Sequence, residues 1–487
     1  MNLRFSIVIP TCDRPNLLAT TLPACLLTDR NDVEVLVSDN FSGPDTMSVI
    51  DRFRGDPRVR AVRTDRRLPL ADHWEFAWQH ARGDFIIINS DDDVLSPQLL
   101  TDIDTASKHI PIGMASWDAG LYLHPDWDLS GANTFQFEAS HTGLIFAINS
   151  RRIIEEYARL NIVRCFPLGT RICFSRRLAE RIRKRVGRIF WTPHPDYSAP
   201  LLLLGLMDGH ERYLYFDSVL GYGGRSRDSN AAATVPKERG RAGNAARARM
   251  FRDEHGTENL MGDLEFQAIT LTNGHAQTLA LLRRLLPEAF GGFHLDLVAY
   301  IAGIEGEFRG INIHSPWLGP EERADFDRFL ARQDPQVVKQ ALRVVEERWF
   351  NERVEKWEKD WRNISVPVIR HLLKRHVLSG VLKRTLKRLL RRLTRPASAE
   401  ARMGVRPGLR ADFHGVMVTV HCESFGGRNG LDLARRIDEI ISAYDQRVDR
   451  NLVDFYSKDY MIAAHVPESF SLRAAATYGE ADKKDAA

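Results

Sequence analysis

Cysteine is scarce in this chain of 487 residues, and the five that it has are scattered: Cys12, Cys25, Cys165, Cys173 and Cys422. None falls in a C-x-x-C spacing, which excludes a disulfide framework and a cysteine zinc site and is typical of a reducing compartment. No stretch approaches the roughly 20 apolar residues that span a bilayer. Residues 1–4 lead straight into a strand without the layout of a signal peptide. We therefore expect a cytoplasmic protein, with a peripheral position on the inner face of the plasma membrane left open.

Two nucleotide-binding motifs are also missing. The turn after the first strand lacks G-x-G-x-x-G, which argues against nicotinamide chemistry, and G-x-x-x-x-G-K-[ST] is absent, which excludes a P-loop enzyme. The net charge is only +4, so the distribution of charge matters more than its total. With 44% hydrophobic and 27% charged residues the chain falls in the ordinary soluble globular class. Its length is too great for one core, so we expect more than one domain.

Short apolar strands and helical segments alternate through the first 110 residues. The strands are expected at 5–10, 33–37, 58–62 and 85–88, and the helical segments from 15, at 44–54 and at 70–81. This order predicts an α/β fold with a Rossmann-like, mostly parallel sheet flanked by helices.

Three adjacent carboxylates, Asp91, Asp92 and Asp93, directly follow the apolar run 85–88. Ligands of open α/β sheets bind beyond the carboxyl ends of the strands. Adjacent aspartates repel one another and are costly to bury unless a cation compensates them. The cluster therefore suits a hard divalent cation that neutralises a phosphate. The alternative is a solvated acidic turn that leads into the helix beginning at Ser96-Pro97.

Three motifs in order resemble those of the family 2 glycosyltransferases, of the kind that act on bacterial cell-surface glycans. They are Ser6-Ile7-Val8-Ile9-Pro10-Thr11-Cys12-Asp13-Arg14, then Val37-Ser38-Asp39-Asn40-Phe41-Ser42, then Ala81-Arg82-Gly83-Asp84 running into Asp91-Asp92-Asp93. The resemblance implies the GT-A fold and a D-x-D motif. Carried over by position, it implies that the nucleotide sugar is bound by Thr11, Asp13, Asp39, Asp91 and Asp92, and that Mg²⁺ or Mn²⁺ is held by Asp93 and Asp91. Taken singly, Asp39 also suits a turn former and Asp13 a helix N-cap.

The next stretch, to about residue 230, carries a candidate catalytic base. Strands are expected at 112–117, 119–123, 213–216 and 219–222, a short apolar run at 142–146, and helices at 176–186 and 200–207. Asp196 stands near the start of the last helix, where the dipole lowers the pKa of a carboxylate and keeps it ionised as a base. By resemblance Asp196 is the catalytic base; a plain N-cap is the alternative, and His194 is a second candidate. Gly224, Ser226 and Ser229 suit either a diphosphate-binding loop or a linker.

The rest of the chain is mainly helical. We expect domains at 1–230 (GT-A, with a nucleotide-binding half at 1–110 and an acceptor half at 111–230), a linker at 231–258, a helical region at 259–395 and a small α/β tail of unknown role at 396–487. Helices are expected at 262–286, 320–333 and 335–361, and in the tail a strand at 413–422 and a helix at 431–448.

Residues 368–395 hold ten Lys or Arg and no acidic residue, with apolar residues every three or four positions. This pattern predicts a basic amphipathic helix, a form that lies on anionic membranes with about 1 kcal/mol from each basic residue. Packing on the catalytic domain is the alternative. Nucleic acid is not expected as a partner, because no aromatic residues are interleaved and no binding module is present.

Together these features predict a metal-dependent, inverting glycosyltransferase. The donor would be a nucleoside-diphosphate sugar, and the acceptor a hydroxyl of a glycan or lipid-linked glycan in cell-surface polysaccharide synthesis. One alternative is a nucleotidyltransferase, although the glycine-rich first loop usual in that class is absent. Another is a non-catalytic sugar-binding or membrane-surface scaffold with the same fold.

Overall fold

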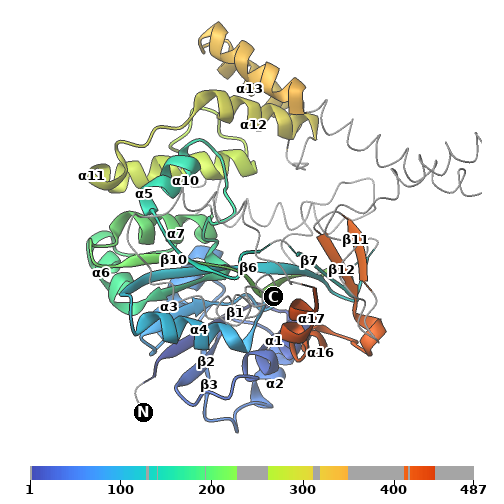
Figure 1. Ribbon diagram of the computed structural model, residues 1–487. Coiled ribbons are helices and arrows are strands. Elements are labelled where there is room, and N and C mark those ends of the chain that lie inside the picture. The colour runs from blue at the N-terminus through green and yellow to red at the C-terminus, as the bar shows by residue number, and fades with distance from the viewer. Residues whose placement is uncertain are drawn as a thin grey trace, which may run out of the picture.

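The computed structural model (Figure 1) describes residues 3–127, 131–139, 141–191, 194–227, 262–310, 318–348, 411–414 and 417–444. Within these residues a 12-stranded mixed sheet forms the centre of the molecule. Its main path runs β11-β12-β7-β6-β9-β4-β1-β2-β3, and β10 pairs with β5, β6 and β8 off that path. The α/β fold with helices on the sheet is confirmed.

The strands of the N-terminal half run parallel to one another. Its strands are β1 (Phe5–Thr11), β2 (Val33–Asp39), β3 (Val59–Arg63) and β4 (Phe85–Ile88), in the order β4-β1-β2-β3. They are connected by α1 (Pro15–Cys25), α2 (Pro44–Asp51) and α3 (Leu70–Gln79), and α4 (Pro97–Ser107) follows. Every residue of β1, β2 and β4 is buried, which explains why their sequences are apolar runs without alternation. All four predicted strands are present.

The second half contributes β5 (Val94–Leu95), β6 (Ile112–Leu123), β7 (Thr134–Glu138), β8 (Ile145–Ile148), β9 (Ile172–Ser175) and β10 (Arg212–Arg225). Its helices are α5 (Ser150–Ala158), α6 (Arg176–Val186) and α7 (Pro195–Leu206), with a 3₁₀ turn η1 (Gly169–Arg171). The two strands expected in 112–123 are one strand, β6. The two expected in 213–222 are also one, β10, whose pairing with β6 shifts register between Phe216 and Tyr222. These irregularities interrupt the apolar pattern along β10, and β7, β9 and α5 were not predicted.

The helical region packs on this domain through α7. It comprises α10 (Leu271–Leu285), α11 (Pro287–Phe290), α12 (Leu297–Arg309), α13 (Pro320–Leu330) and a helix over 335–348. Leu282, Phe290 and Leu202 belong to the same buried cluster, and Gly205 of α7 touches the Phe290 ring. The helix expected from residue 262 begins only at 271, because Thr270 caps it by accepting the Asn273 N–H at 2.9 Å.

The tail joins the central sheet. It forms β11 (Ala411–His414), β12 (Met417–His421), η5 (Cys422–Phe425), α16 (Gly430–Ala434) and α17 (Ile437–Tyr444). β12 pairs antiparallel with β7, so the strand expected at 413–422 is a hairpin that extends the sheet. The helix expected at 431–448 is two short helices.

Two predicted segments, the linker 231–258 and the basic helix 368–395, lie outside the described residues, and the division into domains stays a prediction. In the part of the chain that is described, no helix has the length and apolar character needed to cross a membrane.

Candidate active site

Three of the predicted residues meet at one edge of the sheet. Thr11 ends β1, Asp39 ends β2 directly beside it, and Asp91 follows β4. Because parallel strands end at the same edge, residues far apart in sequence become neighbours there. Thr11 Oγ1 donates a hydrogen bond to Asp91 Oδ2 at 2.7 Å, so the first and third motifs are in direct contact.

Asp13 lies in the loop after β1 (the first loop), and Asp39 begins the loop after β2 (the second loop). Their carboxylates form hydrogen bonds with the second loop. Asp13 has a left-handed backbone (φ 53°), and its Oδ1 accepts the Gly43 N–H at 2.8 Å. Its carboxylate is thus engaged by the second loop, whereas the N-cap position of α1 belongs to the next residue along the chain. Asp39 is fully buried, accepts the Ser42 N–H at 3.1 Å and pairs with Arg63 at 2.8 Å. The turn-forming role considered for Asp39 is therefore present in the structure.

The loop that carries Asp91, Asp92 and Asp93, here called the aspartate loop, contacts β10. The Gly224 N–H donates to Asp93 Oδ1 at 3.0 Å. A Cβ at position 224 would lie 2.0 Å from the Asp92 carbonyl oxygen, so only glycine permits this approach. Gly224 therefore contacts the aspartate that the sequence assigned to the metal. Ser226 is buried, and Ser229 lies outside the described residues.

Asp196 lies in the first turn of α7. The turn η1 lies against Asp196 through its first residue and acts on the aspartate loop through its last. A Cβ on Gly169, the first residue of η1, would come within 2.6 Å of the Asp196 Cα. Arg171, the last residue of η1, reaches β10, where its Nη2 would lie 3.3 Å from a Cβ on Gly223. Its charge acts on Asp93. Among the described residues, only the backbone N–H of Asp196 itself forms a hydrogen bond with the Asp196 carboxylate.

The sequence of the N-terminal half matches a known family. Residues 6–106 fit the model described as Glycosyl transferase family 2. The match identifies residues 6–106 as a family 2 glycosyltransferase region. A protein with this region is a glycosyltransferase, and its mixed sheet flanked by helices is consistent with the GT-A fold.

Solved structures with a similar arrangement share little sequence with this glycosyltransferase. One is S. aureus TarS, residues 1–349, with a TM-score of 0.39 and 12% identity over 68% of this chain and 93% of that chain. The same TarS fragment in complex with UDP-GlcNAc gives 0.40 and 11% over the same shares. The mannosyltransferase PcManGT from Pyrobaculum calidifontis, in complex with GDP-Man and Mn²⁺, gives 0.35 and 16% over 71% and 87%. Such low scores carry no argument of their own. No curated protein matches the chain in sequence.

The aspartate loop of the glycosyltransferase carries more negative charge than the protein compensates. Burial raises the pKa of Asp91 to about 6, against the opposing effect of Arg14. Burial, followed by the Asp92 charge, raises the pKa of Asp93, against the Gly224 N–H and Arg171. Both shifts mean that the ionised forms lack a sufficient counter-charge. A divalent cation would supply it.

These residues fit a Mg²⁺ or Mn²⁺ ion that is shared with a substrate. Among the described residues, no three His, Cys, Asp or Glu side chains are arranged as a complete metal site. Mg²⁺ typically takes one or two carboxylates, with substrate phosphates and water as its remaining ligands. Asp93, with Asp91 beside it, meets that requirement, and the ion would neutralise a bound diphosphate.

Two arginines of the site had no role in the sequence prediction. Arg14, in the loop after β1, places its Nη1 at 3.2 Å from Asp91 Oδ1 and 3.8 Å from Asp92 Oδ2. It therefore brings a positive charge to the aspartate loop. Its place at the end of the first motif was the only signal for it. Arg171 had none, because it lies in a three-residue 3₁₀ turn far from the motifs.

His194 packs against the helical region. Its ring lies against Gly274 of α10, 5.6 Å from the ring of His275 in an edge-on arrangement. Burial lowers the pKa of His194 to about 4, so the ring is neutral. This packing favours a structural role.

Proposed function

We propose that this enzyme moves a sugar from a nucleoside-diphosphate sugar to a hydroxyl of a glycan or lipid-linked glycan, with inversion at the anomeric carbon. Asp196 takes the proton of the acceptor hydroxyl while the hydroxyl oxygen of the acceptor attacks the anomeric carbon. The bond from that carbon to the diphosphate breaks, and the diphosphate leaves. Asp93 and Asp91 would hold Mg²⁺ or Mn²⁺, which would supply a positive charge to neutralise the diphosphate.

The state of Asp196 is the observation that carries this proposal. The sequence suggested that the helix dipole lowers its pKa; that expectation is wrong, because burial outweighs the dipole and raises the pKa to about 6. A base is most effective when its pKa lies close to the working pH. Among the described residues the carboxylate accepts a hydrogen bond only from its own backbone N–H, so other lone pairs stay available for an acceptor proton.

The first two loops support the donor site. Thr11, Asp13 and Asp39 bring backbone and carboxylate groups to the edge where β1 and β2 end. Phe41, between the aspartate and serine of the second loop, is 52% exposed, with the Arg63 guanidinium 5.1 Å from its ring. An exposed ring at this place offers a stacking surface for the nucleotide base. Asp91 and Asp92 would then face the ribose and diphosphate.

The acceptor and the location of the enzyme rest on the sequence. A role in cell-surface polysaccharide synthesis would require access to acceptors at the inner face of the plasma membrane. The ten basic residues of 368–395 would provide it through anionic lipids. Binding of the full chain to anionic vesicles, compared with a chain lacking 368–395, tests this part separately.

The donor site is tested by thermal unfolding of the purified protein with UDP, GDP, CDP or dTDP and the corresponding sugars, each with and without Mn²⁺. A ligand at 100 times its dissociation constant stabilises the folded state by about 2.7 kcal/mol. We expect one nucleotide to raise the Tm, and to do so more strongly with Mn²⁺.

Asp93→Ala provides the matched variant. It should unfold as the wild type does without ligand, but lose the Mn²⁺-dependent part of the shift. An unchanged shift in Asp93→Ala would remove this residue from the metal site. If no nucleotide shifts the wild type, the proposed donor site is wrong.

A further inference from the structure

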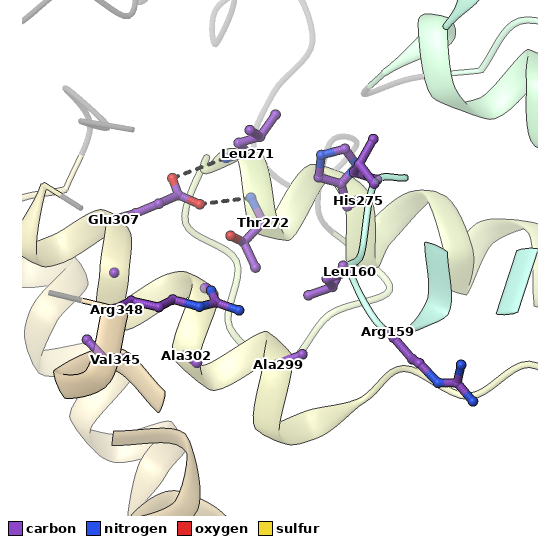
Figure 2. Close-up of a pocket in the computed structure, with 13 residues that line it drawn as sticks. Arg159, Leu160, Leu271, Thr272, His275, Ala299, Ala302, Glu307, Val345 and Arg348 are labelled. Carbon is purple, nitrogen blue, oxygen red and sulfur yellow. Dashed lines mark hydrogen bonds between the residues drawn. The ribbon is translucent and has the colours of Figure 1, made fainter. Parts of the chain in front are cut away.

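A pocket lies in the helical region, away from the aspartate loop (Figure 2). It has a volume of about 200 Å³ and opens between α10, α12, the helix over 335–348 and the turn that follows α5. The proposed reaction assigns no role to it.

Small residues on one face of α12 create the hollow. Ala299, Ala302, Gly303 and Gly306 all line the pocket and follow one another at helical spacing. Gly303 has a packing function, since a Cβ there would come within 2.8 Å of the Thr272 side chain of α10. The two alanines leave space that larger side chains would fill.

The acidic group of the pocket is already used. Glu307 accepts the Leu271 N–H at 3.3 Å and the Thr272 N–H at 2.8 Å, one with each carboxylate oxygen. Figure 2 shows both bonds at the start of α10. The Glu307 carboxylate thus lies at the positive end of that helix, which favours its charged form, although burial still raises its pKa.

Arg348 supplies a cation to the pocket. Figure 2 shows its side chain extending into the pocket between Thr272 and Ala302, whereas Arg159 points away; Arg159 pairs with Glu156 at 2.9 Å. The acidic residues beside Arg348 on its own helix are also paired, Glu346 with Arg309 at 2.5 Å and Glu347 with Arg343 at 2.9 Å. Among the described residues, no carboxylate forms an ion pair with Arg348.

A buried polar ring completes the lining. His275 is only 6% exposed, and its Nδ1 lies 3.1 Å from the Tyr157 hydroxyl. No described residue forms a hydrogen bond with its other nitrogen, Nε2. Burial and the neighbouring His194 lower the pKa of His275 to about 3, so the ring is neutral and Nε2 can pair with a ligand.

We propose that this pocket binds a compact anionic group, a phosphate or a carboxylate, with Arg348 as its cation and His275 as a hydrogen-bond partner. The group belongs either to a charged acceptor or to a free small anion. The pocket lies close to the catalytic domain. The centres of the His275 and Tyr197 rings are 4.3 Å apart in an edge-on contact, and Tyr197 directly follows Asp196 in the chain. An occupant would therefore be one layer of rings away from the proposed base.

Calorimetric titration of the full chain with inorganic phosphate, and then with glycerol 3-phosphate, tests the site without relying on the transfer reaction. We expect Arg348→Gln to weaken binding roughly tenfold or more, the effect of losing a charge-assisted contact. Arg343→Gln is the matched control on the same helix, because its side chain is 81% exposed and pairs with Glu347. Ala299→Leu should also weaken binding by filling the hollow.

Two outcomes would overturn the proposal: no binding to the wild type, or equal affinity in the Arg348 and Arg343 variants. Phosphate at the donor site would contribute equally to both variants and does not confuse the comparison. Kinetics then separates the two sources. A higher KM for a charged acceptor in Arg348→Gln indicates that the anion is part of the acceptor. A phosphate-dependent change in rate that Arg348→Gln abolishes indicates a free anion.

Discussion

Asp91 in the aspartate loop is a buried carboxylate and Asp196 on α7 a partly buried one. Desolvation raises the pKa of both to about 6, but they are held in different ways. Asp91 accepts a hydrogen bond from Thr11 and faces Arg14. Asp196 has no side-chain partner among the described residues, and only its own backbone N–H opposes the effect of burial. The first arrangement holds the carboxylate in a fixed position. The second leaves the carboxylate without a competing side-chain partner among the described residues.

The largest effect is expected from Asp196→Asn. The amide keeps the shape of the side chain but cannot take a proton, so kcat should fall by about 10²- to 10⁴-fold, the usual contribution of a general base. Donor binding, measured by the Tm shift with nucleotide and Mn²⁺, should be unchanged. Glu321→Gln is the control, since it occupies the same first-turn position after a proline in α13. A wild-type rate in Asp196→Asn would assign the base to another residue.

Arg171→Gln should have the next largest effect. Arg171 lies between the two carboxylate environments, so the loss of its charge leaves Asp93 and a bound diphosphate less compensated. We expect kcat/KM to fall roughly ten- to a hundredfold, as for a charge-assisted contact. Arg151→Gln, in a surface pair with Glu155, should be silent. Equal activity of the two variants would mean that Arg171 acts only in packing.

The pH dependence sharpens the comparison further. A base works in its ionised form, and the pKa of Asp196 is about 6. The rate with saturating substrates should therefore rise about tenfold per pH unit below 6 and level off above it. In Asp196→Asn this rise of the rate with pH should be absent. If the rise persists in the variant, another group controls it.

The smallest effect concerns the support that the tail gives to the aspartate loop. The Tyr222 hydroxyl, two residues before Gly224, donates to the Gly430 carbonyl at 3.0 Å. A Cβ at Gly430 would lie 2.2 Å from this hydroxyl, so Gly430→Ala should destabilise the fold by about 1–3 kcal/mol through overpacking.

Gly292→Ala is the control for this substitution, because nothing lies within 4 Å of the Cβ position there. Thermal unfolding compares the two variants. Equal Tm values would mean that the tail is not held against β10 in solution. Gly430→Ala should weaken donor binding but leave the pH dependence of the rate unchanged, since the contact supports the aspartate loop and not α7.

The sequence alone predicted the N-terminal half and most of the proposed donor site. Three of the four strands of this half, β1, β2 and β4, are fully buried and read as mainly apolar runs, whereas β3 is partly exposed. Parallel strands bring the residues at their ends to one edge. Thr11, Asp39 and Asp91 therefore follow from their positions after three strands. The position of Asp196 near the start of α7 was also visible, because Pro195 marks a first helical turn. The roles of these residues stay predictions until the variants are measured.

Only the tertiary structure decided which groups surround these carboxylates. Arg171 and Gly224 come from a short 3₁₀ turn and an irregular strand, which leave no periodic pattern to recognise. The raised pKa of Asp196 also depends on chain packed around it, where local sequence suggested the opposite shift. The tail strands and the Arg348 pocket arise from contacts between segments that are far apart in the sequence. Such contacts are set by packing of the whole chain, and local patterns carry little information about them.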